Sequence, residues 1–550
     1  MSILQPNTMF ATNMGREAVL RLHSPIHFSL CRRCMAYFSN EEPSPTITVP
    51  QPLVKKIQKA LIRKEVERIE KMNEKLRPKG PLIIKCKRKA YNHYTGEAFS
   101  KFKPELLASH GWKHHKSVGD YFVINGKRPN PALQSGLKFE DFGLHEAITK
   151  SLHSMNIKEP THIQALTIPE MLNNNNVICA AETGSGKTLA YLLPILHMLK
   201  INPFDGLDQR PNCPRSVIVV PARELVDQVY YVARRIMDNL HLSVLALSGG
   251  HKAKFFEKKE KVDMVVGTPG TLISAMKEGH FDLSAAEHLV LDEGDTLLDD
   301  SFATFVSRLF KNIQVGQSAS GMLGAAQLAI VGATLPRGLD TVLEDIAPIE
   351  SFTKVTTKHL HKLMPHVPQK FVRLTPKKQG EYMLKLAREL QRKEVPVMVF
   401  CNSVKTCYWL SRFLKENGVE CMELHKQLDR KERAGRFQRF RRREFNILIC
   451  SDIASRGLDT TWVQHIVNFD FPRFMSDYIH RVGRVGRVGS EQPGFVTSLV
   501  IHNWDVELLW QIETAVRQME QFHNVNANIK RKLQGRHARK KEIEEAMAGR

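Results

Sequence analysis

The sequence predicts an α/β protein of two tandem domains, each built on a mainly parallel sheet. Short apolar runs with β character alternate with helix-like segments from about residue 137, and the same alternation returns after residue 368. Strands that alternate with helices form parallel sheets, because each helix carries the chain back to the edge where the previous strand began. At 550 residues the chain has room for both domains and for further segments at its two ends.

Each block contains six candidate strands. In the first block they span 177–180, 216–220, 243–247, 263–266, 288–291 and 328–331. In the second block they span 370–374, 396–400, 419–423, 446–450, 465–469 and 495–500. The two blocks join near residues 350–368. The segment 314–326, rich in Gln, Gly, Ser and Ala, is expected to be a flexible surface insertion.

A glycine-rich loop lies between the first strand and the helix-like run that follows it. The loop comprises Ala181, Glu182, Thr183, Gly184, Ser185, Gly186, Lys187 and Thr188. Glycines let the backbone curl so that its N–H groups point at phosphate oxygens, and the positive end of the next helix adds to the attraction. Lys187 would reach the β- and γ-phosphates, and the Thr188 hydroxyl would hold Mg²⁺. Because Ala181 replaces the usual first glycine, a simple glycine-rich turn is the alternative.

Two acids follow the apolar run 289–291. Asp292 and Glu293 would stand at the carboxyl end of a buried strand, where phosphate-loop enzymes carry the acids that orient Mg²⁺ and water. We expect Asp292 to orient Mg²⁺ through its water shell and Glu293 to activate the attacking water. The alternative is a polar turn after a strand. The phosphate loop 105 residues upstream of Asp292 argues against that alternative.

The net charge of +23 is unevenly distributed. Residues 1–136 carry +14 and residues 523–550 carry +5, whereas the long central region 137–522 carries only +4. Basic flanks around a near-neutral core favour a polyanionic partner such as nucleic acid. Solvated, partly disordered extensions that only keep the protein soluble are the alternative.

Cysteine usage and hydropathy argue against two classes of protein. The nine cysteines are scattered, which suits a reducing compartment better than a disulfide framework. Cys31 and Cys34 form a lone CxxC pair, and a zinc site requires four ligands. No apolar run approaches the roughly 18–20 residues that span a membrane, so we expect no membrane insertion.

The N-terminal 136 residues divide into two parts. Residues 1–40 interleave basic and apolar residues around a single acid, Glu17, which predicts a mitochondrial transit peptide and a matrix location. The alternatives are an ordinary disordered terminus and a nucleolar basic tail, the latter with a nuclear or nucleolar location. Residues 41–136 form a basic extension in which Tyr91, Tyr94, Phe99 and Trp112 stand among charges. This pattern fits either RNA stacking or a small packing cluster. Residues 526–550 form a basic tail.

The region 137–520 resembles the DEAD-box RNA helicases of superfamily 2, whose motifs occur here in the family's order and spacing. The resemblance implies two RecA-like domains, at 137–355 and 368–525, joined by a linker at 356–367. It also implies ATP and Mg²⁺ as cofactors, with Gln164 on the adenine edge and Phe139 stacked on the adenine ring. Lys187, Asp292 and Glu293 would then be catalytic residues.

The resemblance also assigns residues of the second domain and the RNA contacts. Arg484 and Arg487 would act as arginine fingers on the γ-phosphate, and Gly457 and Asp459 would contact the nucleotide, with Asp459 on the ribose hydroxyls. The RNA contacts would come from Arg223, Gly249, Gly250, Thr268, Gly270 and Ser451. Such contacts go mostly to phosphates and 2′-hydroxyls, so little sequence readout is expected.

Five positions depart from the family pattern: Ala222, Thr271, Gly294, Gly332 and Arg430. Gly332 replaces a serine whose hydroxyl would contact the acid motif, and Gly294 replaces an alanine within it. Ala222 lacks a hydroxyl that would touch an RNA phosphate. These departures favour ATP and RNA binding over efficient strand separation.

The resemblance thus predicts an ATP-dependent RNA helicase whose RNA-stimulated ATP hydrolysis remodels RNA duplexes or ribonucleoproteins. With the predicted presequence, it suggests a role in mitochondrial large-subunit ribosome assembly, with ribosomal RNA and assembly intermediates as partners. An ATP-gated RNA clamp that unwinds little is the alternative. A DNA-directed helicase fits the RNA-specific motifs less well.

Overall fold

The computed structural model describes most of the region from residue 80 to residue 525. The described residues are 80–97, 99, 107–126, 137–202, 212–248, 261–298, 303–313, 315, 326–334, 343, 349–425, 427–452, 459–490, 492, 494–522 and 525. They belong to one compact unit, Lys79–Arg550. The predicted transit peptide, the basic tail 526–550, and the insertion 314–326 except residues 315 and 326 lie outside the described residues.

The first α/β domain contains a seven-stranded sheet with every neighbouring pair parallel. Its strand order is β10-β4-β9-β8-β5-β7-β6. The strands are β4 (Asn176–Ala180), β5 (Ser216–Val219), β6 (Val244–Leu247), β7 (Met264–Gly267), β8 (His288–Asp292), β9 (Gln327–Gly332) and β10 (Phe352–Thr356). The six predicted strands are confirmed to within one or two residues, and β10 was not predicted.

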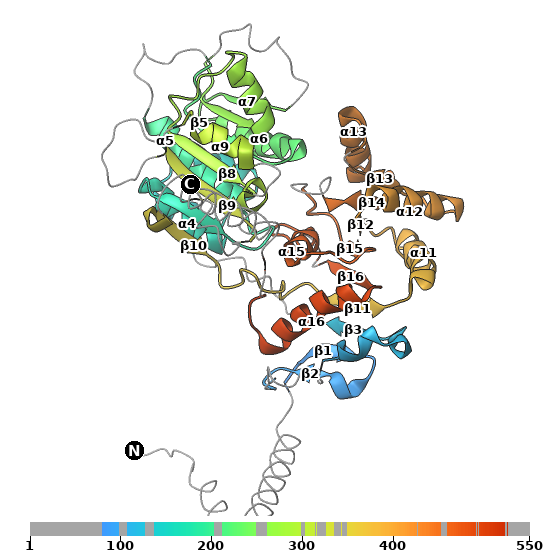
Figure 1. The fold of residues 1–550 in the computed structure, drawn as a ribbon. Helices are drawn as coiled ribbons and strands as arrows, with labels where there is room; N and C mark the ends of the chain where they lie inside the picture. Colours follow the sequence, from blue (N-terminus) through green and yellow to red (C-terminus); the bar gives the residue numbers. More distant parts are fainter. Residues whose placement is uncertain are drawn as a thin grey trace, which may run out of the picture. The chain divides into compact units, whose positions relative to one another are not determined.

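Helices cover both faces of this sheet (Figure 1). They are α3 (Glu146–Ser154), α4 (His162–Leu172), α5 (Lys187–Ile201), α6 (Arg223–Met237), α7 (Pro269–Lys277), α8 (Gly294–Leu297) and α9 (Ala303–Phe310), with the 3-10 turn η6 (Phe139–Phe142) before α3. Alternate residues of one strand enter separate hydrophobic clusters, Val177 on one face and Ile178 on the other. The strands are therefore buried on both sides and appear as continuous apolar runs in the sequence.

The second α/β domain contains a nine-stranded sheet in the order β13-β14-β12-β15-β16-β11-β3-β1-β2. Six strands form its parallel part: β11 (Gln369–Arg373), β12 (Val397–Cys401), β13 (Met422–Leu424), β14 (Ile447–Ser451), β15 (His465–Asn468) and β16 (Phe495–Val500). The strand predicted at 419–423 lies at 422–424. The helices of this domain are α11 (Pro376–Arg392), α12 (Val404–Glu416), α13 (Arg430–Arg441), α15 (Met475–Val482) and α16 (Asn503–Gln518).

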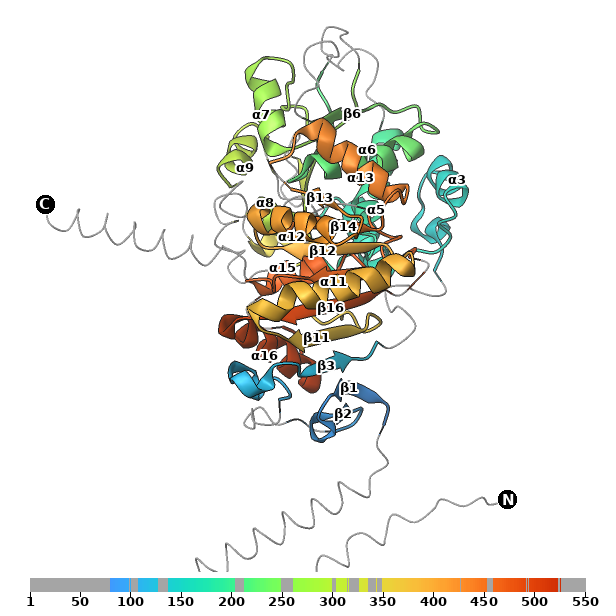
Figure 2. The same cartoon turned by 90° about the vertical axis from the view of Figure 1, so that its right-hand side faces the viewer.

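Three strands of the second sheet come from the N-terminal extension, which the sequence did not reveal. They are β1 (Leu82–Cys86), β2 (His93–Tyr94) and β3 (Tyr121–Ile124). Strand β3 pairs antiparallel with β11, and β1 pairs antiparallel with β3 and β2. Part of the extension predicted at 41–136 is thus an integral piece of the second domain, and Figure 2 shows it beyond β11.

Two aromatic residues of this segment, Trp112 and Phe122, pack into the core. Trp112 is 1% exposed, and its ring lies 5.6 Å from that of Phe122, which in turn stacks on Phe371 of β11. Of the two interpretations that the sequence left open, a packing cluster is therefore confirmed for Trp112. Its ring is not available for stacking on RNA.

A buried ion pair fastens this segment to α16. Glu513 is fully buried and accepts hydrogen bonds from Ala108 N (2.7 Å), Ser109 N (3.0 Å) and Ser109 Oγ (2.5 Å). Arg517, one turn later, donates to the same carboxylate at 2.8 Å and to the Tyr91 carbonyl at 2.8 Å. Since a buried charge is costly unless it is paired, this network holds the segment in one place.

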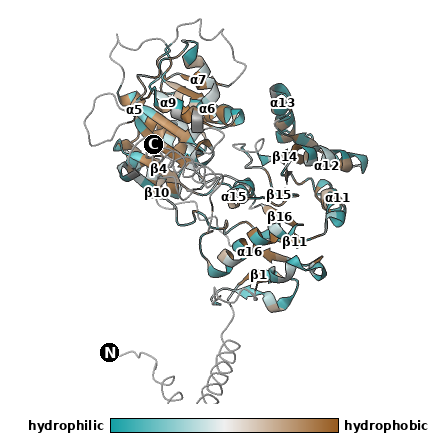
Figure 3. Cartoon of the chain, in the orientation of Figure 1, coloured by the Kyte–Doolittle hydropathy of each residue, from teal (hydrophilic) through white to brown (hydrophobic). Residues whose placement is uncertain are grey.

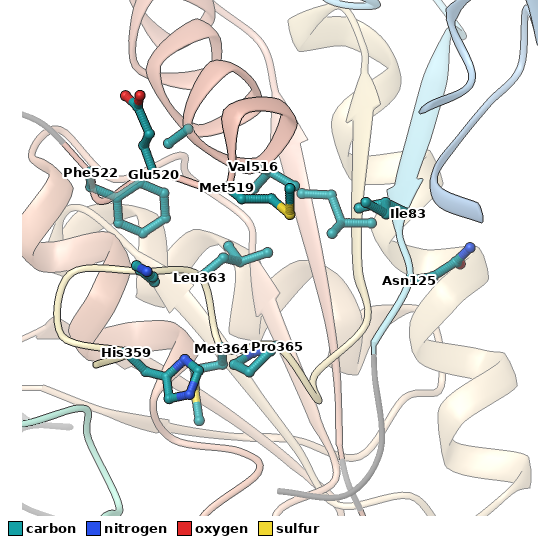
Figure 4. A pocket seen from close by; sticks show the side chains of 13 residues that line it. Ile83, Asn125, His359, Leu363, Met364, Pro365, Val516, Met519, Glu520 and Phe522 are labelled. Atoms are coloured by element: carbon teal, nitrogen blue, oxygen red, sulfur yellow. The ribbon is translucent and has the colours of Figure 1, made fainter. Parts of the chain in front are cut away.

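An apolar cavity of about 240 Å³ lies where β1, the linker and the end of α16 meet (Figure 4). Ile83, Leu363, Met364, Val516 and Phe522 form much of its wall. The cavity shows that the linker packs against the N-terminal strands. Among the described residues, no helix has the length and apolar character needed to cross a membrane.

Candidate nucleotide site and RNA-facing surface

The glycine-rich loop connects β4 to α5, as predicted. Gly184 and Gly186 have φ values of 79° and 88°, in the left-handed region that glycine tolerates best. A Cβ at Gly184 would lie 2.4 Å from Arg487 Cγ, and one at Gly186 would lie 2.6 Å from Gln164 Nε2. These two positions therefore need glycine both for their backbone angles and for the side chains packed against them.

Lys187, the first residue of α5, turns its side chain back across the loop. Its Nζ donates hydrogen bonds to the carbonyls of Ala181 and Glu182, each at 2.9 Å. Burial lowers the pKa of this ammonium group, while the nearby Cys179 and Asp292 act in the opposite direction. The cation is thus held at the mouth of the loop, where a phosphate would approach.

Asp292 ends β8 and is buried. Its Oδ2 accepts a hydrogen bond from the Tyr191 hydroxyl at 2.8 Å, and its Oδ1 accepts one from Glu293 N at 2.9 Å. Burial, reinforced by the charge of Glu293, raises the pKa of Asp292 from 3.8 to about 6. Tyr191 lies one turn after Lys187 on α5 and was not among the predicted site residues. Its spacing of four from Lys187 was the only sequence signal for it.

Glu293 has an unusual backbone conformation for its residue type. Its φ is 50°, in the left-handed region, at the start of α8. Such strain persists only where the surroundings impose it, and it concentrates at functional sites. Among the described residues, its buried Oε2 has no hydrogen-bond partner. A buried carboxylate oxygen without a partner can bind the water molecule that the predicted role requires.

Asp295 links three motifs. Its carboxylate accepts hydrogen bonds from Thr334 N at 3.0 Å and Thr334 Oγ1 at 2.6 Å, and it lies 3.4 Å from His480 Nε2 of the second domain. Burial alone would raise the pKa of Asp295, but His480 and Thr334 hold it below its usual value. A Cβ at Gly332 would lie 3.4 Å from Asp295 Cγ. A serine hydroxyl at this position would reach the Asp295 carboxylate, so Gly332 removes only this one contact.

Gln164 and Phe139, which the resemblance assigns to adenine, are both buried. Gln164 Oε1 accepts from Thr161 N at 2.9 Å, and its Nε2 donates to the Gly186 carbonyl at 2.9 Å. The amide therefore touches the phosphate loop directly. Phe139 is 1% exposed and lies in the same hydrophobic cluster as Ile148. Its ring face is not open to the surface here, so stacking on adenine stays a prediction.

The arginines of the second domain have two different surroundings. Arg481 is buried and holds its own domain together, through Asp452 (2.5 and 2.7 Å) and the Asn402 amide oxygen (2.5 Å). Arg487 instead lies against the phosphate loop, since Val488 N donates to the Gly184 carbonyl at 3.0 Å. Burial lowers the pKa of Arg487, while the charges of Asp459 and Glu293 act in the opposite direction.

The two predicted fingers thus differ in position. Arg484 Nε donates to the His480 carbonyl at 3.1 Å, and the Arg484 carbonyl accepts from Thr460 Oγ1 at 2.7 Å, so these contacts stay within the second domain. The structure places Arg487, with Asp459 3.9 Å from its Nη1, beside the predicted nucleotide residues.

The predicted RNA contacts that are described lie at the ends of strands and the starts of helices. Arg223 begins α6, and Thr268 and Gly270 stand at the start of α7. Thr271, which replaces a frequent arginine of the family, donates to the Leu247 carbonyl at 2.8 Å and so connects the start of α7 to the end of β6. Ser451 Oγ is buried and has no partner among the described residues. Gly249, Gly250 and Gly457 lie outside the described residues.

Mg²⁺ fits the oxygen donors of this site. The Tyr191 hydroxyl donates to Asp292 and also interacts with Thr188, so the two predicted metal ligands lie close to one hydroxyl. Within the described parts of the chain, no cluster of three or more His, Cys, Asp or Glu side chains could hold a metal by itself. Mg²⁺ commonly binds through one or two protein oxygens, with substrate phosphates and water completing the shell.

These features define a two-domain phosphate-loop hydrolase of the helicase type. A phosphate loop and an acid pair stand at the carboxyl ends of two strands of one parallel sheet, and an arginine of a second sheet domain lies against the loop. Family models agree: residues 161–342 match the DEAD/DEAH box helicase domain, and residues 380–489 match the helicase conserved C-terminal domain. The chain belongs to the DEAD-box family of ATP-dependent RNA helicases.

Two relatives match 91% and 72% of the chain. The human "Probable ATP-dependent RNA helicase DDX28" is 37% identical over 522 residues, covering 91% of this chain and 96% of the relative. The Arabidopsis thaliana "DEAD-box ATP-dependent RNA helicase 39" is 32% identical over 400 residues, which cover 72% of this chain and 63% of the relative.

Solved structures share the fold. S. cerevisiae Dbp5 bound to RNA and ADP BeF3 matches with a TM-score of 0.58 and 24% identity, covering 70% of this chain and 94% of that chain. Mss116p bound to ssRNA and AMP-PNP matches with a TM-score of 0.59 and 22% identity, covering 72% and 80%. The RecA-like architecture predicted from the sequence is thereby confirmed.

Proposed function

We propose that this chain couples RNA-stimulated ATP hydrolysis to local remodelling of RNA duplexes or ribonucleoproteins. The observation that carries the proposal is the contact of Arg487 and Val488 with Gly184. It brings a cation of one domain to the phosphate loop of the other, so the complete hydrolytic site needs both domains. A ligand that bridges the domains, such as an RNA strand, would then favour the complete site.

The residues have separable roles in this proposal. Bound Mg²⁺, held by Thr188 and Asp292, would neutralise phosphate charge. Lys187 would exchange its two loop carbonyls for phosphate oxygens. Glu293 would accept the proton of the attacking water, and Arg487 would stabilise negative charge on the transferred phosphoryl group. Gln164, through its bond to Gly186, would transmit nucleotide binding to the loop.

We further propose that the protein acts in mitochondrial large-subunit ribosome assembly on ribosomal RNA. The support is the presequence-like composition of residues 1–40 and the strongly basic flanks. A fusion of residues 1–45 to a fluorescent reporter should enter mitochondria. A reporter that stays in the cytosol or collects in the nucleolus would contradict the matrix location. Crosslinking of the full chain in isolated mitochondria should recover large-subunit ribosomal RNA above other transcripts.

An ATP-gated RNA clamp remains the second candidate. The observation that favours it is Gly332, which offers no hydroxyl to Asp295. Thr334 does contact Asp295 with both its N–H and its hydroxyl, so part of the connection is kept. Unwinding of a short RNA duplex, measured per ATP hydrolysed, separates the two candidates, because a clamp would hydrolyse ATP and hold RNA without releasing the strand.

The decisive experiment measures ATP hydrolysis by the wild type and by Glu293→Gln, with and without single-stranded RNA. We expect RNA to stimulate the wild type and expect the variant to bind ATP and RNA but to hydrolyse little. Stronger stimulation by a DNA strand of the same length than by RNA would point to a DNA-directed enzyme. An absence of RNA stimulation in the wild type would contradict the proposed function.

A further inference from the structure

Positive charge is concentrated in one short stretch of the second domain. Residues 430–444, which comprise helix α13 and the three residues after it, contain seven arginines, one lysine and two glutamates, a net charge of +6. The whole region 137–522 carries only +4. The rest of the two-domain core is therefore slightly negative, and its positive charge is local.

This stretch lies at one edge of the second sheet. Strand β13 is the edge strand opposite β2, and α13 stands beyond it (Figures 1 and 2). Phe440 and Phe445 are buried and anchor the helix, while Arg436 bonds Glu423 of β13 at 2.7 Å. Figure 3 colours much of the α13 ribbon as hydrophilic.

The seven cations whose side chains the structure describes fall into two groups. Arg433, Arg436 and Arg439 pair with Glu224 (3.5 Å), Glu423 (2.7 Å) and Glu444 (2.6 Å), respectively. Lys431, Arg441 and Arg443 are exposed and form no recorded ion pair with another described residue. Arg442 lies 4.0 Å from Glu444 and is also exposed.

Helix energetics explain only part of this arrangement. Cations in a last helical turn interact favourably with the helix dipole, by about 0.3–1 kcal/mol each. That accounts for basic residues near Arg441, but not for Lys431 at the other end of the helix. Like charges so close together also repel one another. The cluster therefore lowers stability unless a ligand neutralises it.

We propose that the exposed face of α13 and residues 442–443 bind the sugar–phosphate backbone of an RNA duplex next to the strand held between the domains. Lys431, Gly435, Gln438 and Arg442 follow helical spacing and share this face. A Cβ at Gly435 would meet nothing within 4 Å, so the helix surface is open between the two charged ends. The inference rests on the proposed RNA-dependent function.

Two observations favour RNA over an acidic protein as the ligand. Seven of the eight cations are arginine, whose planar fork matches phosphate oxygens better than lysine does. The face also lacks an exposed apolar side chain, since Phe437 is half-buried and the other aromatics are buried, whereas protein interfaces need an apolar centre.

The position of the helix fits a continuous RNA path. Arg433 reaches Glu224, which stands next to the predicted RNA contact Arg223 in the first domain. From Arg433 to Arg441, the last residue of α13, the helix rise of about 1.5 Å per residue gives roughly 12 Å. The unpaired arginines thus continue outward from the predicted RNA groove.

The test compares R441Q/R442Q/R443Q with a matched control, K377Q/K378Q/K385Q, which removes three exposed cations from α11 of the same domain. Each full-length protein is titrated, with AMP-PNP and Mg²⁺, against a short single-stranded RNA and against the same strand extended by a 16-base-pair duplex. We expect the arginine variant to lose about tenfold in affinity for the duplex-bearing RNA at moderate salt. The slope of log affinity against log salt should become shallower by about two to three.

The short strand should bind the arginine variant within about twofold of the wild type, and the control variant should behave like the wild type on both RNAs. Equal losses in the control, equal losses on both RNAs, or no loss at all would each overturn the inference. In those cases RNA-stimulated ATP hydrolysis by the wild type would still support the proposed function. A wild type without that stimulation would instead contradict the proposed function itself.

Discussion

The hydrogen bond from Tyr191 to Asp292 should set the pH range in which the enzyme works. In the proposed mechanism Asp292 must be ionised to orient Mg²⁺. Its pKa is raised to about 6 mainly by burial, and the Tyr191 hydroxyl lowers it. Tyr191→Phe keeps the ring and removes only the hydroxyl. A hydrogen bond to a charged group contributes about 1.5–3 kcal/mol, so the pKa of Asp292 should rise by about one to two units.

The assay is the pH dependence of kcat/KM for ATP at saturating RNA, which reports the ionisation of the free enzyme. We expect the acid limb of the wild type to fall near pH 6 and that of Tyr191→Phe to fall between about pH 7 and 8. Above that range the two rates should converge. A uniform loss at every pH, or an unchanged acid limb, would refute the role given to this hydroxyl.

The raised pKa of Asp292 also makes the stability of the fold depend on pH: ionisation of Asp292 supports activity at high pH but destabilises the folded protein there. Folded Asp292 keeps a proton that the unfolded chain releases between about pH 4 and pH 6, so its contribution destabilises the fold above pH 6. That cost shrinks as the pH falls through 6 and is gone below about pH 4. A modest gain in the stability of the first domain on Asp292→Asn at pH 8 should therefore disappear near pH 4.

Three further substitutions test the packing around the site and the N-terminal strands. Gly332→Ser should place a hydroxyl near Asp295 and raise the amount of duplex separated per ATP hydrolysed. If this amount does not change, the absent hydroxyl does not limit the coupling of hydrolysis to strand separation. Gly294→Ala places a Cβ 2.7 Å from Ile330 Cγ2, and such overpacking costs about 1–3 kcal/mol. In a double-mutant cycle, Gly294→Ala combined with Ile330→Ala should destabilise the protein by less than the sum of the two single substitutions. Simple additivity of the two costs would contradict the clash. Glu513→Ala leaves Arg517 buried and unpaired, which should cost about 3–5 kcal/mol and speed hydrogen exchange in β3. As a control, Lys113→Ala removes the exposed ion pair with Glu507 and should cost at most about 1 kcal/mol. Equal effects of Glu513→Ala and Lys113→Ala would refute the role given to the buried ion pair of Glu513 and Arg517.

The linear order of the chain carried most of the catalytic prediction. Fully buried parallel strands appear as apolar runs, so β4 and β8 could be located within a residue. The phosphate loop and the acids Asp292 and Glu293 follow those strands directly. Their positions depend on local chain geometry, which the sequence pattern predicts directly.

The contacts of Tyr191 and Arg487 could not be predicted in the same way. Tyr191 occupies an ordinary apolar position of a buried helix, and only the three-dimensional approach of α5 to β8 gives its hydroxyl a partner. The contact of Arg487 with Gly184 joins residues about 300 positions apart, in different domains. Side-chain partners at such separation depend on packing, which leaves no periodic signal.

The amino-acid sequence alone predicted the family and the two-domain α/β class, both of which are confirmed, and it shows the uneven distribution of charge. The roles of the nucleotide residues stay predictions. Only the tertiary structure decided that β1, β2 and β3 complete the second sheet, that Trp112 is a core residue, and which cations of residues 430–444 form ion pairs. The reason is physical. Short antiparallel strands such as β2 bury little surface by themselves and are held by partners hundreds of residues away, so their own composition resembles that of a basic extension.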